Sequence, residues 1–210
     1  MIRYNTILKA ASVEQIIDKS KFIASVCPVE NKVEADAFIA EIRSKYKDAT
    51  HNVPAMVIGD KFQIQWASDD GEPQGTAGAP IVQMLVKEGV TNLAVVVTRY
   101  FGGIKLGTGG LVRAYTSSAK LGLSEAGLCA VKDMHVVLVK LDYTYLSKLQ
   151  NLSQSEDFEI QHLIYEDAVT AQLCTDPENE FNLKEMLSNL TGGTVLFLEQ
   201  KVEQIKVSIG

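Results

Sequence analysis

The 210-residue sequence has only three cysteines, Cys27, Cys129 and Cys174, and they lie far apart. Neither a disulfide framework nor a paired-cysteine metal site is therefore indicated. No apolar run approaches the roughly 18 residues that a membrane-spanning helix needs, and the most continuous one is Leu93–Val97. The first residues also lack the apolar stretch of a secretory signal. We therefore expect a cytoplasmic protein with reduced thiols and no membrane partner.

Several catalytic motifs are missing as well. There is no G-x-S-x-G elbow and no H-E-x-x-H helix, so serine hydrolase and zinc protease chemistry have no support. A Walker A loop would place its lysine after the glycines, whereas Lys105 precedes them. A dinucleotide loop would place glycine where Val112 stands. ATPase and nicotinamide chemistry are thus disfavoured, and we expect no cofactor.

Charge is unevenly spread along a chain whose formal net charge is −6. Between residues 89 and 130, four basic side chains stand against Glu125 alone, whereas 13 acidic and 6 basic side chains follow from residue 131 onward. A ligand responds to the local field rather than to the total charge. The middle of the chain could therefore meet an anion although the whole chain is acidic.

Hydrophobic periodicity predicts an α+β fold in two domains, 1–130 and 131–210. In the first domain, the β-branched run Leu93–Thr98 is typical of a central strand buried on both faces. Helices are expected after Asn31, over Ala79–Lys87, and from about Gly110 to Leu123. Further strands are expected in the following ranges: Ile2–Leu8, Glu14–Ile17, Phe22–Val26, Val53–Ile58 and Phe62–Trp66.

The second domain follows a boundary predicted at Gly127–Asp133. Its expected elements alternate in the order βαββαβ, which is the order of a ferredoxin-like sandwich. The predicted strands are Val136–Leu141, Ile160–Tyr165, Val169–Cys174 and Val195–Leu198, and the predicted helices lie near Tyr145–Ser153 and Glu180–Leu190.

Glycine gathers in the first domain, where 11 of the 15 glycines lie between Asp69 and Gly127. A loop of this kind between a buried strand and a helix can aim free backbone N–H groups at an anion. Basic side chains lie in the same segment, so phosphate or another anion is the natural ligand. The candidate phosphate- or nucleic-acid-binding residues are Arg99, Lys105, Gly107, Thr108, Gly109, Gly110 and Arg113. Alternatively, the glycines serve only tight turns and close packing.

An acidic cluster precedes this segment. Asp69, Asp70 and Glu72 could bind Mg²⁺ or supply a general base, with His51 as a helper. The alternative is a charged turn in which an aspartate caps the amides around Gly71. We favour the turn, and we assign no catalytic and no metal-binding residue.

Three aromatic residues lie close to the basic ones. Tyr100, Phe101 and Tyr115 could stack on nucleic-acid bases. Aromatic residues at such positions more often belong to the core, and we expect Phe101 to be buried there.

The two glycine-containing stretches, taken together, resemble the IMPACT family. The resemblance rests on Asp69–Pro73 with Gly75–Gly78, on the long run Arg99–Tyr115, and on the earlier segments Ser20–Ile23 and Ala49–Asn52. It covers roughly residues 1–127, and the acidic βαββαβ segment resembles the small C-terminal domain of bacterial members.

The resemblance implies a first domain with the left-handed βαβ fold of the second domain of a small-subunit ribosomal protein. It implies a second domain like domain V of the ribosomal translocase. Eukaryotic relatives regulate translation, whereas for bacterial members RNA or ribosome binding follows from fold analogy alone. We expect a translation-associated protein that binds RNA, the ribosome or another phosphate-bearing ligand, with a protein partner at the acidic second domain. The alternative is an enzyme acting on a small anionic or phosphorylated substrate, assisted by a metal at the acidic cluster.

Overall fold

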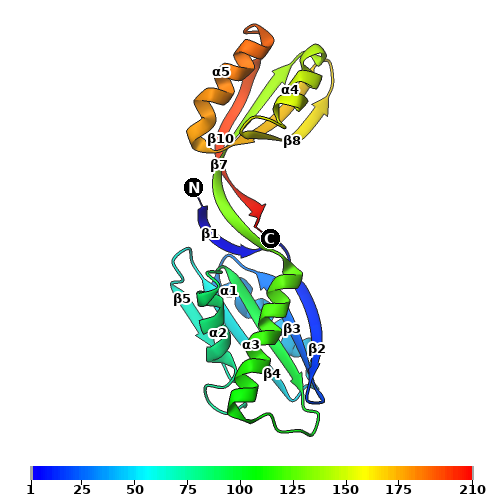
Figure 1. Cartoon of the computed structure of the whole chain (residues 1–210), viewed down its shortest axis with the longest axis vertical. Helices are drawn as coiled ribbons and strands as arrows, with labels where there is room; N and C mark the ends of the chain where they lie inside the picture. The colour runs from blue at the N-terminus through cyan, green and yellow to red at the C-terminus, as the bar shows by residue number, and fades with distance from the viewer. Residues whose placement is uncertain (1, 210) are drawn as a thin grey trace. The chain divides into compact units, whose positions relative to one another are not determined.

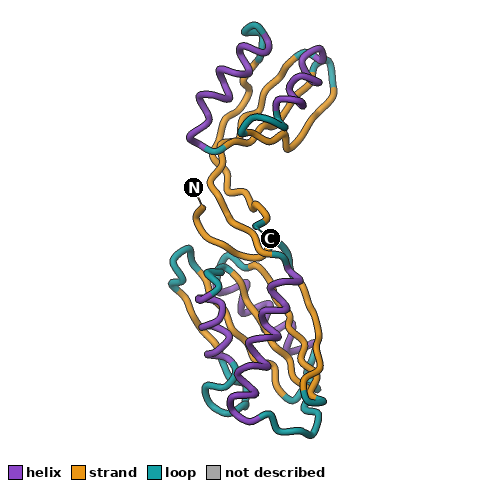
Figure 2. Tube along the Cα trace, viewed as in Figure 1, coloured by secondary structure: helices purple, strands orange, loops and turns teal. Residues whose placement is uncertain are grey.

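The structure is a computed structural model in which residues 2–209 are described (Figure 1). The chain forms two compact units. One comprises residues 3–131 together with 206–209, and the other comprises 132–205 together with Ile2. Each contains helices packed on a mainly antiparallel sheet (Figure 2), which confirms the predicted α+β class with two domains.

The first unit is built on a five-stranded sheet in the order β2-β3-β6-β4-β5. Its strands are β2 (Ala11–Ile17), β3 (Ser20–Pro28), β4 (His51–Ile58), β5 (Ile64–Ala67) and β6 (Leu93–Tyr100). Neighbouring strands are antiparallel throughout. Because β3 and β4 both pair with β6, they run parallel to each other, and α1 (Lys32–Lys45) connects them.

Strand β6 separates two hydrophobic clusters. Val95 and Val97 belong to the cluster beneath α2 (Gly78–Lys87) and α3 (Gly107–Ala126), whereas Ala94 and Val96 face the cluster beneath α1. Burying each of the three valine side chains stabilises the fold by about 1.5–3 kcal/mol. The predicted central strand is therefore confirmed, because alternate residues of β6 are buried on opposite faces.

The second unit is built on strands β7 to β10, in which β9 pairs with β7 and β8, and β10 pairs with β7. Strand β1 (Ile2–Ile7), which lies mostly in the first unit, also pairs with β7. The described residues of the second unit form two α-helices. Its helices pack on one face of the sheet, where Leu149, Leu183 and Leu187 meet Val137, Val139 and Leu173. Its elements are β7 (Leu128–Leu141), η1 (Tyr143–Tyr145), α4 (Leu146–Leu152), β8 (Phe158–Tyr165), β9 (Val169–Thr175), η2 (Pro177–Asn179), α5 (Glu180–Thr191) and β10 (Leu196–Ser208). The predicted βαββαβ order is confirmed.

The predicted start of β7 and the predicted end of β10 were wrong. Strand β7 starts at Leu128, inside the segment expected to be a boundary, because pairing with β1 extends it. Strand β10 runs to Ser208 rather than ending at Leu198, since it pairs with β7 through polar residues. Within the described chain, no helix is long and apolar enough to cross a bilayer.

Candidate functional site

The two glycine-containing stretches meet at one end of the first sheet. There β6 ends and β4 begins, and His51 lies opposite Arg99 in the antiparallel register. The turn between β2 and β3 lies at the same end, because Lys21 pairs with Tyr100. Helix α3 starts there after the loop that follows β6 (Figure 1).

Asp69 organises the loop before α2. Its carboxylate accepts backbone N–H groups of Gly75 at 2.8 Å, Gly78 at 2.9 Å and Ala77 at 3.1 Å. Partial burial acts to raise the pKa of Asp69, but these three hydrogen bonds outweigh it and hold the pKa below its usual value. Asp69 thus stabilises the N-terminal end of α2, which has no side-chain cap of its own.

Asp70 has a left-handed backbone conformation, with φ at 49°. It joins its own loop to α1 and to the start of β4. One carboxylate oxygen accepts from Arg43 Nη2 at 2.9 Å and the other from the Asn52 N–H at 2.6 Å. Its carbonyl lies 2.7 Å from His51 Nδ1. A carbonyl only accepts, so His51 carries its proton on Nδ1 in this arrangement.

Glu72 is the centre of a buried polar cluster. Its side chain is 4% exposed, and Oε1 accepts from Arg99 Nη1 and from the Tyr115 hydroxyl, both at 2.7 Å. His51 Nε2 lies 3.8 Å from the same oxygen. Burial, followed by the Glu72 carboxylate, raises the pKa of Tyr115 far above its usual range. Tyr115 therefore serves here as a neutral hydrogen-bond donor.

The Arg99 guanidinium lies between two aromatic rings. It is 5.5 Å from the centre of the Phe22 ring and 5.3 Å from that of Phe101. Nη2 lies 3.4 Å from Ser20 Oγ, whereas buried Nε has no hydrogen-bond partner among residues 2–209. Of the predicted phosphate-binding residues, Arg99 is the one placed in a buried ion pair, with its side chain 6% exposed.

The remaining predicted phosphate-binding residues gather at the start of α3. Gly107, Thr108, Gly109 and Gly110 form its first turn, which has neither a capping side chain nor an acidic residue. The first N–H groups of a helix have no intrahelical acceptor, and the helix dipole adds partial positive charge there. The amides of this turn therefore face solvent in a field that favours anions.

Two exposed cations lie beside this turn. Lys105 precedes it by two residues, and Arg113 follows it by three residues. Neither side chain has an ion pair or hydrogen bond to any of residues 2–209. Arg113 Nη1 would lie 3.9 Å from a Cβ placed on Gly109, so the guanidinium folds back over the first turn.

Glycine has two distinct roles in this segment. At Gly102 a Cβ would lie 1.9 Å from the carbonyl oxygen of Lys19, so the packing interpretation applies there. Gly107 instead has φ at 71° and open space where a Cβ would be. It therefore supplies an unusual backbone angle at the entry to α3 and leaves the backbone accessible.

Phe101 was expected in the core, and this expectation was wrong. The residue is 47% exposed, because it follows the last residue of β6 and leaves the sheet with the loop. No feature of the sequence distinguished it from its buried neighbours. Tyr115, by contrast, is fully buried.

The acidic residues are thus occupied by protein groups. Asp69 holds amides, Asp70 holds Arg43, and Glu72 holds Arg99 and Tyr115. Among residues 2–209, no three His, Cys, Asp or Glu side chains are placed to hold a metal ion together. An aspartate caps backbone amides here, as in the turn favoured from the sequence, but these amides belong to Gly75, Ala77 and Gly78 rather than to the residues around Gly71.

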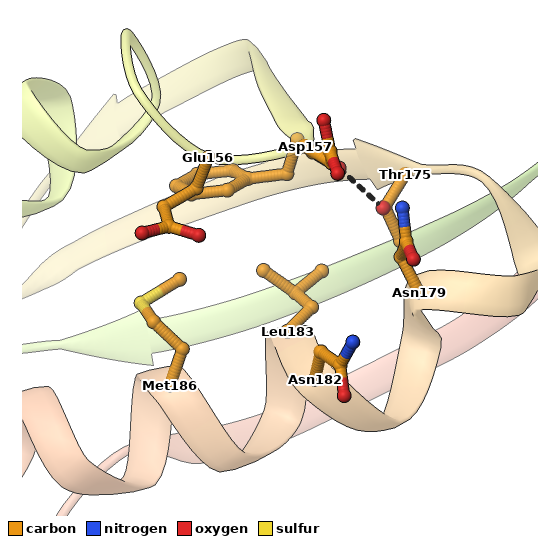
Figure 3. A pocket seen from close by; sticks show the side chains of 8 residues that line it. Glu156, Asp157, Thr175, Asn179, Asn182, Leu183 and Met186 are labelled. Carbon is orange, nitrogen blue, oxygen red and sulfur yellow. Dashed lines mark hydrogen bonds between the residues drawn. The ribbon is translucent and has the colours of Figure 1, made fainter.

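The second unit has a small pocket of about 350 Å³, including its open mouth. Figure 3 shows Leu183 and Met186 pointing from α5 toward the segment that carries Glu156 and Asp157. Thr175 donates a hydrogen bond to the Asp157 carbonyl at 2.6 Å. Neither of the two carboxylates pairs with a basic group among the described residues. The pocket thus combines an apolar floor with an acidic rim.

Comparison with known families matches both units. The Impact N-terminal domain matches residues 18–123, and a domain of unknown function (DUF1949) matches residues 139–194. The chain is 38% identical to the IMPACT family member YvyE of Bacillus subtilis, with 97% of each chain covered. It is 31% identical to the IMPACT family member YigZ of Escherichia coli, covering 89% of this chain and 93% of the relative.

A solved structure is similar over most of the chain. A crystal structure of a hypothetical protein superposes with a TM-score of 0.58 at 30% sequence identity, covering 93% of this chain and 96% of that one. Both domain matches, the full-length relatives and this structural likeness agree with the resemblance seen in the glycine-containing stretches. The chain therefore belongs to the IMPACT family.

Proposed function

We propose that this chain is a cytoplasmic, translation-associated protein that binds RNA phosphate through the start of α3. The observation that carries the proposal is the pair of unpaired, exposed cations, Lys105 and Arg113, beside an uncapped glycine turn. Backbone amides, a helix N-terminus and basic side chains are the groups by which proteins hold phosphate. This chemistry supports a phosphate-bearing ligand, which we propose to be RNA, whether free or ribosomal.

Arg99 has a supporting role in this proposal. Its charge is neutralised by Glu72 within a buried cluster, so it orders the end of β6 rather than meeting phosphate directly. Lys105 and Arg113 are left to make the electrostatic contacts.

The proposal is tested by the salt dependence of RNA binding. We expect Lys105→Ala/Arg113→Ala to weaken binding of a labelled single-stranded RNA, measured by fluorescence anisotropy between about 50 and 200 mM salt. Each lost phosphate contact makes the negative slope of log K against log salt shallower by about 0.7, so the slope of the double variant should be shallower by about 1.4. An unchanged affinity and slope would contradict the proposal.

A matched control removes the same charge elsewhere. Lys61 and Lys87 are exposed and lie toward the opposite end of the first sheet, where β4 and α2 end. Lys61→Ala/Lys87→Ala should leave the slope unchanged. If both double variants lower it equally, the binding reflects net charge rather than the site.

The enzymatic alternative has less support, because all three carboxylates already have protein partners. It makes a different prediction for Asp70→Asn, which would abolish turnover of a small anionic substrate. For an electrostatic binding protein, the same change leaves RNA affinity nearly intact.

The acidic second unit is proposed to avoid RNA and to contact a protein. The pocket in Figure 3 supports this, since a lysine or arginine side chain could lay its apolar stem on Leu183 and Met186 and its charge beside Glu156. Glu156→Gln/Asp157→Asn should weaken the binding of a lysine-rich peptide while leaving RNA affinity within about twofold. An unchanged peptide affinity would remove this contact from the proposal.

A further inference from the structure

Phe101 presents one ring face to the protein and leaves much of the ring to solvent. The Arg99 guanidinium carbon lies 5.3 Å from the centre of this ring and 5.5 Å from the ring centre of buried Phe22. A cation–π contact to a buried arginine thus holds the Phe101 ring, while the residue stays 47% exposed. Ile104, three residues later, is also exposed, at 41%. The loop that carries Lys105 therefore also carries two exposed apolar side chains.

The backbone beneath this ring is fixed. The Phe101 N–H donates to Thr50 Oγ1 at 3.0 Å, and the Gly102 N–H donates to Ser20 Oγ at 3.2 Å. Gly102 packs so closely on the Lys19 carbonyl that the chain cannot shift inward. A ring held in this way loses little conformational entropy when a ligand stacks on it.

The same loop and helix start also carry positive charge. Lys105 and Arg113 are exposed, flank the first turn of α3 and make no ion pair or hydrogen bond to any of residues 2–209. An exposed aromatic ring and two free cations in one segment match a ligand that combines a flat face with phosphate oxygens.

A nucleotide base with its phosphates has this combination, and within RNA only unpaired nucleotides offer the face of a base. In a duplex the bases stack on one another, whereas single strands are bound by stacking on aromatic side chains beside basic groups. Dinucleotide cofactors are disfavoured because the loop lacks their glycine spacing.

We propose that Phe101 is the base-stacking platform of a single-stranded RNA site. One base lies on the exposed face of the ring, and the flanking phosphates contact Lys105 and Arg113. This inference rests on the proposed function and narrows its ligand from RNA phosphate in general to unpaired RNA.

The test compares three probes of equal length: a uridine-rich single strand, an abasic ribose-phosphate strand and a duplex. Stacking on one aromatic ring contributes about 1–3 kcal/mol per base, which corresponds to about 5- to 150-fold in affinity. We expect Phe101→Ala to lose affinity for the uridine strand within this range and to bind the abasic strand like the unaltered protein. Phe101→Trp should retain binding, whereas Phe101→Leu, which keeps an apolar side chain without a ring, should not.

Two further variants separate the outcomes. Phe181→Ala removes a ring that is 74% exposed in the second unit, and it should bind all three probes normally. Lys105→Ala/Arg113→Ala should weaken binding of the uridine and abasic strands alike. If the unaltered protein binds both strands equally and Phe101→Ala changes nothing, stacking is refuted while phosphate binding stands. If it binds neither strand, the proposed function fails as well.

Discussion

Removing the Glu72 carboxylate should destabilise the first unit more than any other single change at this end of the sheet. Glu72→Ala leaves the Arg99 guanidinium buried without its counter-ion and the Tyr115 hydroxyl without its acceptor. Breaking a buried ion pair by deleting one partner costs about 3–5 kcal/mol. With a urea m-value of about 2 kcal/mol/M, the midpoint should fall by about 2 M.

Fluorescence can follow this unit alone. Trp66 is the sole tryptophan and lies on β5, so its emission reports the unfolding of the first sheet and not of the second unit. Glu72→Gln keeps an acceptor for both partners but loses the charge, and it should cost less than Glu72→Ala. Tyr115→Phe removes one hydrogen bond to a charged group and should cost about 1.5–3 kcal/mol.

A small effect of Glu72→Ala on the free energy of unfolding would refute the role given to this ion pair. If Glu72→Ala costs less than about 1 kcal/mol, water or another group neutralises Arg99 and the cluster does not hold the two stretches together. A double-mutant cycle between Glu72→Gln and Tyr115→Phe adds an independent check. It should give a coupling energy of about 0.5–3 kcal/mol, because the two groups share a hydrogen bond.

Four further substitutions test the surroundings. Asp69→Asn should lower the free energy of unfolding by about 0.5–2 kcal/mol at neutral pH, measured by urea unfolding. Because the folded-state pKa of Asp69 is depressed, its contribution is present above the unfolded pKa of about 3.9 and is lost as pH falls through the folded value. The free energy of unfolding of the variant should therefore change less with pH in the acid range. Gly102→Ala must displace the Lys19 backbone and should lower the thermal midpoint, whereas Gly103→Ala, which meets open space but has a positive φ, should cost only about 1 kcal/mol. Neutralising exposed Glu156 should change the free energy of unfolding by less than about 0.5 kcal/mol.

Much of the fold could be predicted because its signals are local. The β-branched run of β6 can be satisfied only by burial on both faces, and the alternation in Val169–Cys174 fixes one face of β9. The ends of β7 and β10 could not be predicted in this way. Their polar residues join strands through pairing with a distant segment, which local pattern does not encode.

The site was predictable in composition but not in the arrangement of its charges. Glycine spacing and basic residues placed Lys105 and Arg113 in one locality, and the structure brings them to the same helix end. The partnership between Arg99 and Glu72 spans 27 positions, and nothing in either segment specifies it. Phe101 was misplaced for a similar reason, since whether a residue at a strand end turns inward depends on the loop that follows.

The shared oxygen of Glu72 has a consequence for how this chain tolerates change. One atom joins the loop before α2, the end of β6 and the third turn of α3, so the two glycine-containing stretches behave as a single part rather than as two neighbouring motifs. Redesigning either stretch by itself would leave a buried charged group in the other without its partner. Grafting this end of the molecule onto another scaffold would therefore require moving both stretches at once.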